Sequence, residues 1–151
     1  MKAIQLIDSQ KDFTVASIGR LDDLSGFSYL HPGMKQSVPG KVFTGKMMAS
    51  TGAEISFQAM PAGTEIPFYH RHHQNEEIYI FLRGQGQFLL NDRQYDDQEG
   101  TMIRVAPGVR RSRRNHSDSD LVFMVIQTRQ DSLESYETSD GIGVNAKPEW
   151  H

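Results

Sequence analysis

Three of the six histidines of this 151-residue chain lie within four residues, at His70, His72 and His73, and a carboxylate follows at Glu77. In an extended segment alternate side chains point to the same side, so His70 and His72 share one face. Neutral imidazoles and a carboxylate suit Fe, Mn, Ni, Zn or Cu, and two histidines with one carboxylate form the ligand set of non-haem iron sites. The spacing predicts a divalent transition-metal site at His70, His72 and Glu77. A solvated polar loop is the alternative.

A run of arginines lies between residues 110 and 114. In a regular strand Arg111 and Arg113 share a face. Guanidinium groups pair with carboxylates and phosphates, so these two side chains predict a binding site for a small anionic ligand. The alternative is a set of surface charges that are balanced by Asp118 and Asp120.

Strands must position these residues, because short apolar runs broken by Gly, Pro, Asn and Asp dominate the sequence and helical periodicity is scarce. We expect strands at residues 54–60, 77–82, 87–90, 101–105 and 121–128, with Asn91 and Asp92 as a hairpin turn. Residues 13–18 and 41–48 are weaker strand candidates, and residues 25–39 read as a long loop.

The whole chain, residues 1–151, is expected to form one domain. Residues 1–50 supply N-terminal strands and a loop that pack on a barrel, residues 54–128 form the barrel core, and residues 129–151 are a polar tail. Both faces of the expected strand 77–82 are apolar beyond Glu77, so the second face is expected to be covered. The N-terminal segment or a second subunit could cover it, and the second case predicts a homodimer.

Composition excludes several classes of function. The chain has no cysteine, which excludes disulfides, thiolate catalysis and cysteine-based zinc sites. The formal net charge is -3 and the pI is about 6.0, values that indicate neither nucleic-acid binding nor a membrane-surface patch. No membrane-spanning run and no signal peptide are expected, and a cytoplasmic location is compatible with the absence of cysteine.

Residues 63–115 resemble the cupin superfamily in two motifs. The first is Gly, His-x-His, three or four residues, Glu, six residues and Gly; residues 70–84 match it, and the leading Gly63 lies one residue further out than the usual spacing. The second begins at Gly100, reaches Pro107-Gly108 and ends at Asn115. The resemblance implies an all-β jelly-roll barrel, a double-stranded β-helix, with the motif residues in its mouth.

The chain departs from the family pattern at Arg111, which occupies the position of the family's fourth metal ligand, a histidine. A guanidinium stays protonated and has no lone pair for a cation. Arg111 could turn away from a three-ligand metal site, pair with Glu77 in place of a metal, or mark a vestigial site. Tyr79 lies beside the cluster and could line a pocket, although aromatic residues on a barrel strand are more often core.

The predicted function is binding of a metal ion, a small organic ligand, or both, in the barrel mouth. One alternative is a mononuclear metal-dependent enzyme of the dioxygenase, decarboxylase or sugar isomerase type, since the fold does not select among these. Another is a metal-free sensor or carrier of an anionic molecule, held by Arg111 and Arg113. No residue is assigned as catalytic.

Overall fold

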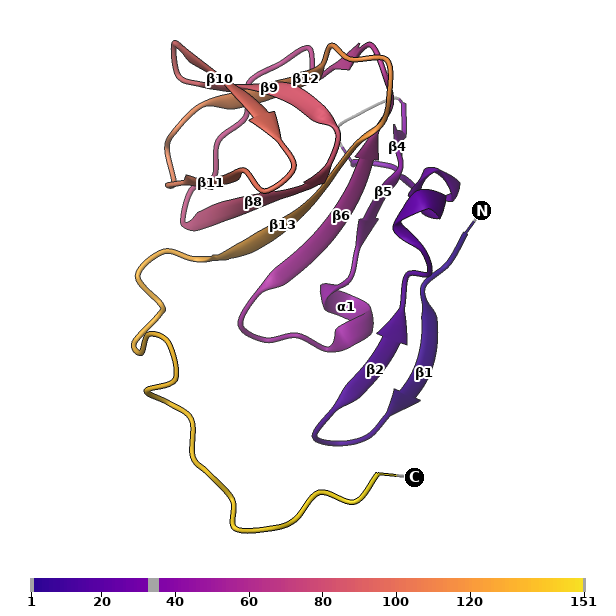
Figure 1. Cartoon of the computed structure of the whole chain (residues 1–151). Helices are drawn as coiled ribbons and strands as arrows, with labels where there is room; N and C mark the ends of the chain where they lie inside the picture. Colours follow the sequence, from indigo (N-terminus) through magenta and orange to yellow (C-terminus); the bar gives the residue numbers. More distant parts are fainter. Residues whose placement is uncertain (1, 33–35, 151) are drawn as a thin grey trace.

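The computed structural model describes residues 2–32 and 36–150, and two facing sheets form its main body (Figure 1). The five-stranded sheet has the order β11-β8-β13-β6-β5, and the four-stranded sheet has the order β10-β9-β12-β7. Their bounds are β5 Lys41–Phe43, β6 Glu54–Met60, β7 Thr64–Glu65, β8 Asn75–Arg83, β9 Gln85–Leu90, β10 Arg93–Gln98, β11 Met102–Val105, β12 Arg111–Asn115 and β13 Leu121–Arg129. The all-β barrel prediction is confirmed.

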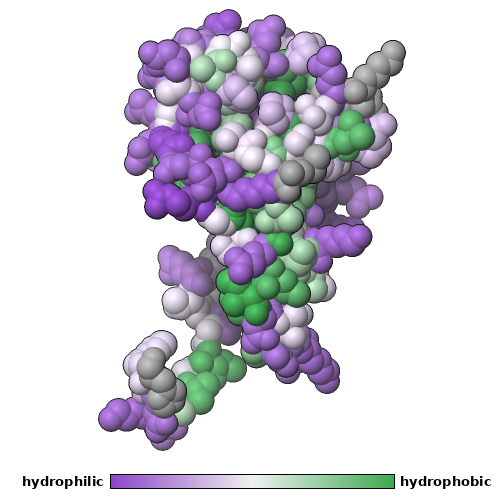
Figure 2. Space-filling model, turned by 90° about the vertical axis from the view of Figure 1, so that its right-hand side faces the viewer, coloured by the Kyte–Doolittle hydropathy of each residue, from purple (hydrophilic) through white to green (hydrophobic). Residues whose placement is uncertain are grey.

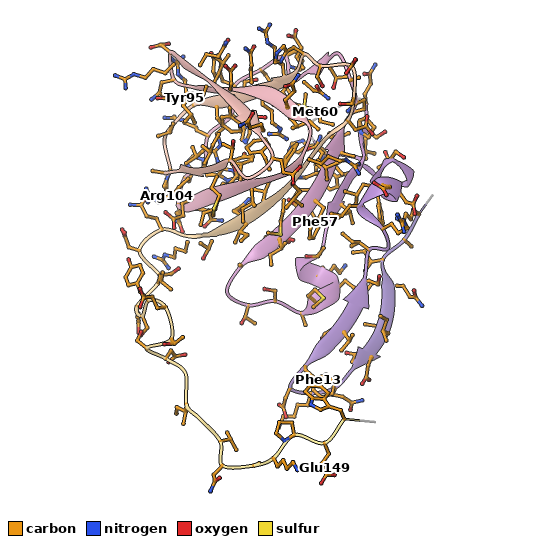
Figure 3. All side chains as sticks on the ribbon, viewed as in Figure 1. Phe13, Phe57, Met60, Tyr95, Arg104 and Glu149 are labelled. Atoms are coloured by element: carbon orange, nitrogen blue, oxygen red, sulfur yellow. The ribbon has the colours of Figure 1, made fainter. Side chains whose placement is uncertain are left out.

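Aromatic side chains fill the space between the two sheets. Tyr79 and Phe81 point inward from β8 and are 1% exposed, as the alternation of that strand predicts. The Tyr79 ring meets Phe88 edge to face, with centroids 4.8 Å apart. Met60, labelled in Figure 3, belongs to the same buried cluster. This core fixes the strand that carries Glu77 and Tyr79.

A row of directly opposed apolar residues crosses the outer face of the five-stranded sheet. The row runs through Met102, Ile80, Met124, Phe57 and Val42. Val42 is 7% exposed, whereas Met102, at the other end of the row, is 65% exposed. The row is therefore covered at its β5 end and open at its β11 end.

The N-terminal segment covers the β5 end of this face. Leu24 of the 3-10 helix η1 (Leu21–Gly26) and Phe27 are buried against Val42 and Val122. The short strands β3 (Ser28–Tyr29) and β4 (Val38–Pro39) pair beside them. The predicted cover of the second face is therefore supplied in part by this segment.

A hairpin of β1 (Gln5–Ser9) and β2 (Thr14–Ser17) projects from the barrel (Figure 1). Four apolar side chains of this hairpin are exposed: Leu6, Ile7, Phe13 and Val15. Figure 2 shows apolar surface below the barrel. After β13 the chain forms turns but no helix or strand through residue 150. No helix among the described residues is long and apolar enough to cross a membrane.

Strand β6 coincides with the predicted strand 54–60, and the loop at Asn91 and Asp92 joins β9 to β10 as predicted. The predicted strand 41–48 is wrong in its second half, because the chain leaves β5 at Phe43 and forms helix α1 (Gly45–Met48). The Gly45 N–H binds Glu54 Oε1 at 2.7 Å, a contact with the next strand that turns the chain. The long loop predicted for 25–39 begins at the end of η1 and contains the short strands β3 and β4, and residues 33–35 within it lie outside the described residues.

Candidate functional site

The structure brings His70, His72 and Glu77 together at one end of the barrel. Two backbone hydrogen bonds pair His70 with Arg111 of β12, at 3.0 and 3.2 Å, and the Gly108 N–H binds the His72 carbonyl at 3.1 Å. Glu77 enters from β8 in the opposite sheet. The site therefore depends on how the two sheets face each other, and not on the sequence spacing alone.

The three side chains present donor atoms that lie within 4.8 Å of one another. His72 Nε2 is 3.3 Å from Glu77 Oε1, and His70 Nε2 is 3.9 Å from Glu77 Oε2. His72 Nε2 is buried and has no hydrogen-bond partner among the described residues. A buried imidazole nitrogen without a partner is costly unless a ligand or metal satisfies it. Two imidazoles and a carboxylate oxygen are also a donor set that divalent transition metals accept.

Arg111 and Tyr79 both bind Glu77, and all three contacts fall on the same carboxylate oxygen. Glu77 Oε2 accepts hydrogen bonds from the Tyr79 hydroxyl at 2.5 Å and from Arg111 Nη2 and Nε at 2.6 and 3.1 Å. Arg111 is 0% exposed, and its Nη1 donates to the Val109 carbonyl at 3.0 Å. The geometry matches the interpretation in which Arg111 pairs with Glu77, and it leaves Glu77 Oε1 facing His72.

The protonation states follow from burial and this pairing. Burial alone would raise the pKa of Glu77, but His72, the Tyr79 hydroxyl and the Arg111 charge outweigh it and hold the pKa well below its ordinary value. Burial and then the Arg111 charge lower the pKa of His70 to about 4. At neutral pH His70 is therefore a neutral imidazole with a lone pair, and Glu77 is a carboxylate.

A cavity of about 480 Å³ opens beside these residues. Tyr79 and Arg113, two of the three predicted ligand contacts, line it together with His70, His72 and Glu77, whereas Arg111 is not part of its wall. The Arg113 guanidinium donates to Gln58 Oε1 at 2.8 Å and stacks 4.7 Å from the centre of the Phe123 ring. These contacts hold the guanidinium at the cavity wall.

Cationic groups in the cavity wall outnumber carboxylates that are free to balance them. Lys41, Arg71 and Arg113 line the wall. Of the two carboxylates there, Glu77 is paired with Arg111, whereas Glu54 accepts the Gly45 N–H and keeps its charge. The electrostatic environment therefore favours an anion.

Sequence reasoning did not identify Lys41. This lysine is only 9% exposed, and its Nζ donates to Ser56 Oγ at 2.9 Å. The available signal is strand alternation, since Lys41 must face the barrel interior if Val42 belongs to the outer core. That signal needs the position of β5 in the sheet, which the sequence does not reveal.

The neighbouring arginines are surface residues, as the alternative interpretation expects. Arg110 pairs with Asp92 at 3.3 Å and lies 5.2 Å from the Tyr69 ring centre, and Arg114 donates to Gln87 at 2.5 and 2.8 Å. Their partners are not the predicted Asp118 and Asp120. Arg111 and Arg113 of β12 therefore point inward, whereas Arg114 of the same strand and Arg110 just before it are exposed.

The fold and the residues at its mouth define a cupin. The profile of the Cupin domain family matches residues 56–127. A cupin protein from Bacteroides fragilis is 38% identical and superposes with a TM-score of 0.66, covering 76% of this chain and 99% of its own. The chain belongs to the cupin family.

Two further solved structures are more distant. A candidate sugar phosphate isomerase from Acidithiobacillus ferrooxidans is 26% identical, with a TM-score of 0.53, covering 60% of this chain and 59% of its own. A Klebsiella pneumoniae protein with a double-stranded β-helix domain is 13% identical, with a TM-score of 0.55, covering 75% of this chain and 90% of its own. A search among curated proteins finds no match.

Proposed function

We propose that this cupin binds a small anionic organic molecule in the cavity beside His70, His72 and Glu77. The observation that carries the proposal is the pairing of Arg111 with Glu77, which neutralises one of the two carboxylates that line the cavity. The Arg113 guanidinium then remains in the wall as a charge for a ligand carboxylate or phosphate. Arg111 itself does not line the cavity, so in this proposal it contributes by neutralising Glu77 and does not contact the ligand.

A divalent transition metal is proposed to bind at the same place, through His70, His72 and Glu77 Oε1. His72 Nε2, which is buried and lies 3.3 Å from Glu77 Oε1 without a hydrogen bond of good geometry, supports this part of the proposal. Such a metal would act as a Lewis acid that polarises a bound oxygen. Because Arg111 already balances Glu77, a dication here would carry uncompensated charge, so an anionic ligand and a metal should strengthen each other's binding.

A metal-dependent enzyme is the second candidate. The similarity to a candidate sugar phosphate isomerase supports it, since a sugar phosphate is an anionic organic molecule of the class proposed here. The cavity, at about 480 Å³, lies within the usual range for small-molecule sites. A sugar phosphate therefore belongs among the first ligands to test.

Calorimetry with carboxylates, inorganic phosphate and a sugar phosphate tests the anion proposal. Arg113→Met should weaken binding by roughly ten- to a hundredfold, the effect of losing a charged hydrogen bond. Arg114→Met is the matched control, because Arg114 is an exposed residue of the same strand that contacts Gln87. Equal affinities for the two variants would contradict the proposal.

Elemental analysis of protein purified without chelator tests the metal. We expect Fe, Mn, Ni or Zn to bind to the wild type and to be lost in His72→Ala. His73→Ala is the control, since His73 is exposed and lies outside the donor group. A wild-type protein that takes up none of these metals would refute the metal part and leave the anion part standing.

A homodimer is also proposed. The open end of the outer row at Met102 and the apolar hairpin that carries Ile7 and Phe13 both expose surface that a second copy of this chain would bury. Light scattering after gel filtration should give a dimer, and Met102→Glu should shift it toward monomer. Tyr95→Glu, on the exposed face of β10, should not. A monomeric wild type would refute the proposal.

A further inference from the structure

We propose that Lys41 is a carbonyl-reactive amine, which forms a reversible imine with an oxo acid bound in the cavity. The inference rests on the proposed function, because it requires an anionic ligand there, and it names the class of that ligand. The evidence is the position of Lys41 in the cavity wall, its burial and its contacts.

Lys41 is buried in a way that is unusual for a lysine. It is 9% exposed, its Nζ lies 4.8 Å from the centre of the Phe43 ring, and Ser56 Oγ accepts its hydrogen bond at 2.9 Å. Within the described residues it forms no ion pair. A buried ammonium with one neutral partner is unfavourable, so the environment favours either the free amine or a bound anion.

The charged groups around Lys41 act in both directions. Burial and then the Arg113 charge lower the pKa of Lys41, Glu77 and Glu54 oppose the change, and the net result is a fall from 10.5 to about 7. A shift of this size gives roughly a thousand times more free amine at neutral pH than an exposed lysine has. The free amine is the form that attacks a carbonyl.

The chemistry balances without a further reactant. The Nζ lone pair attacks the carbonyl carbon, and a carbon–nitrogen bond forms. Both amine hydrogens then leave with the carbonyl oxygen as water, and a carbon–nitrogen double bond remains. Ser56 Oγ lies at hydrogen-bond distance from Nζ and can pass a proton between the nitrogen and the departing oxygen. Hydrolysis returns the amine and the oxo acid.

The neighbours of Lys41 point to a short oxo acid. Lys41 is the direct cross-strand partner of Gln58, and the same Gln58 accepts a hydrogen bond from Arg113 at 2.8 Å. Arg113 and Lys41 therefore flank one residue of β6. A ligand whose carboxylate binds Arg113 would place a carbonyl near Lys41 if few bonds separate the two groups.

Reductive trapping with pyruvate tests the inference. The full-length protein is incubated with pyruvate and cyanoborohydride, and adducts are located by peptide mass spectrometry. We expect trapping at Lys41 to exceed that at any other lysine by roughly a hundredfold, given its larger free-amine fraction. Lys41→Arg, which keeps the charge, and Lys41→Met should both abolish that adduct. Lys46→Met, at an exposed lysine, is the matched control and should keep it.

Lactate distinguishes a failure of the imine proposal from a failure of the anion-binding proposal, because lactate has the carboxylate of pyruvate but lacks its ketone carbonyl. Saturable lactate binding that protects Lys41 from trapping would support both proposals, and lactate binding to Lys41→Met would show that the variant is folded. Equal binding of lactate and pyruvate with no adduct, or adducts spread over exposed lysines, would overturn the imine and leave the anion site. If neither compound binds and no adduct forms, both proposals fail for short carboxylates.

Discussion

Arg111 binds Glu77 through two nitrogens that converge on one carboxylate oxygen, Nη2 at 2.6 Å and Nε at 3.1 Å. The other oxygen of Glu77 is left 3.3 Å from His72 Nε2. The ion pair therefore occupies half of the carboxylate and leaves the other half directed at the histidines. A guanidinium stands where a cupin usually has its fourth metal ligand, and the charge balance of the site changes with it.

Restoring that ligand should strengthen metal binding. Arg111→His supplies an imidazole at a position that faces Glu77 and removes the competing positive charge. We expect affinity for Mn²⁺ or Zn²⁺ to rise by about tenfold or more, the effect of roughly 1.4 kcal/mol. Competition with a chromophoric chelator measures it. Arg110→His is the control, because Arg110 immediately precedes Arg111 in the chain and its side chain is exposed. An unchanged affinity would mean that position 111 cannot reach the metal.

Breaking the buried pair from one side should be costly. Arg111→Met leaves the Glu77 charge without its partner in a buried position and should lower the free energy of unfolding by about 3–5 kcal/mol. Adding Glu77→Gln removes the orphaned charge and should recover part of that loss. Urea unfolding of the two single variants and the double variant gives the coupling. Strictly additive effects would contradict the pairing.

Asp97 predicts a pH-dependent stability. This carboxylate is 1% exposed, and neither oxygen has a side-chain hydrogen-bond partner among the described residues. Burial raises the pKa of Asp97 from 3.8 to about 6, although the charge of Arg113 opposes the change. The folded state therefore holds the proton more tightly than the unfolded chain. Its stability should fall as the pH rises from about 4 to about 6.

Removing this charge should stabilise the protein above that range. We expect Asp97→Asn to gain about 2 kcal/mol at pH 7 and only a small part of that near pH 4, where the folded carboxylate is protonated and the unfolded one, with a pKa of 3.8, is only partly ionised. Thermal unfolding between pH 4 and pH 8 checks the prediction. Asp118→Asn, at an exposed residue, should show no such pH dependence. A gain that does not change with pH would point to a different cause.

Two glycines offer a matched test of how β5 is positioned. Gly40 and Gly63 have nearly the same left-handed φ, +67° and +66°. A Cβ at Gly40 would lie 2.2 Å from the Ala59 carbonyl oxygen, whereas a Cβ at Gly63 would meet nothing within 4 Å. Gly63→Ala should cost about 1 kcal/mol for backbone strain, and Gly40→Ala should cost more because β5 must shift. Urea unfolding measures both, and equal losses would refute the close approach.

Much of the fold could be predicted from local pattern. Residues 77–82 alternate Glu77, Tyr79 and Phe81 with Ile78, Ile80 and Leu82, and the structure places the first set inside the barrel. Alternation has a period of two along one strand, so it requires no knowledge of the neighbouring strands. The alternation of apolar residues did not predict strand β10. This strand lies at the edge of its sheet with most of its side chains exposed, so it shows little apolar pattern.

The sequence by itself determined the class of barrel, the shared face of His70 and His72, and the shared face of Arg111 and Arg113. These follow from spacing along the chain. Only the tertiary structure decided that Arg111 turns to Glu77, 34 residues away, and that Lys41 lies in the same cavity as Arg113. Those relationships depend on which strands face each other across the barrel. That pairing results from burial of the whole core and cannot be found in any one segment.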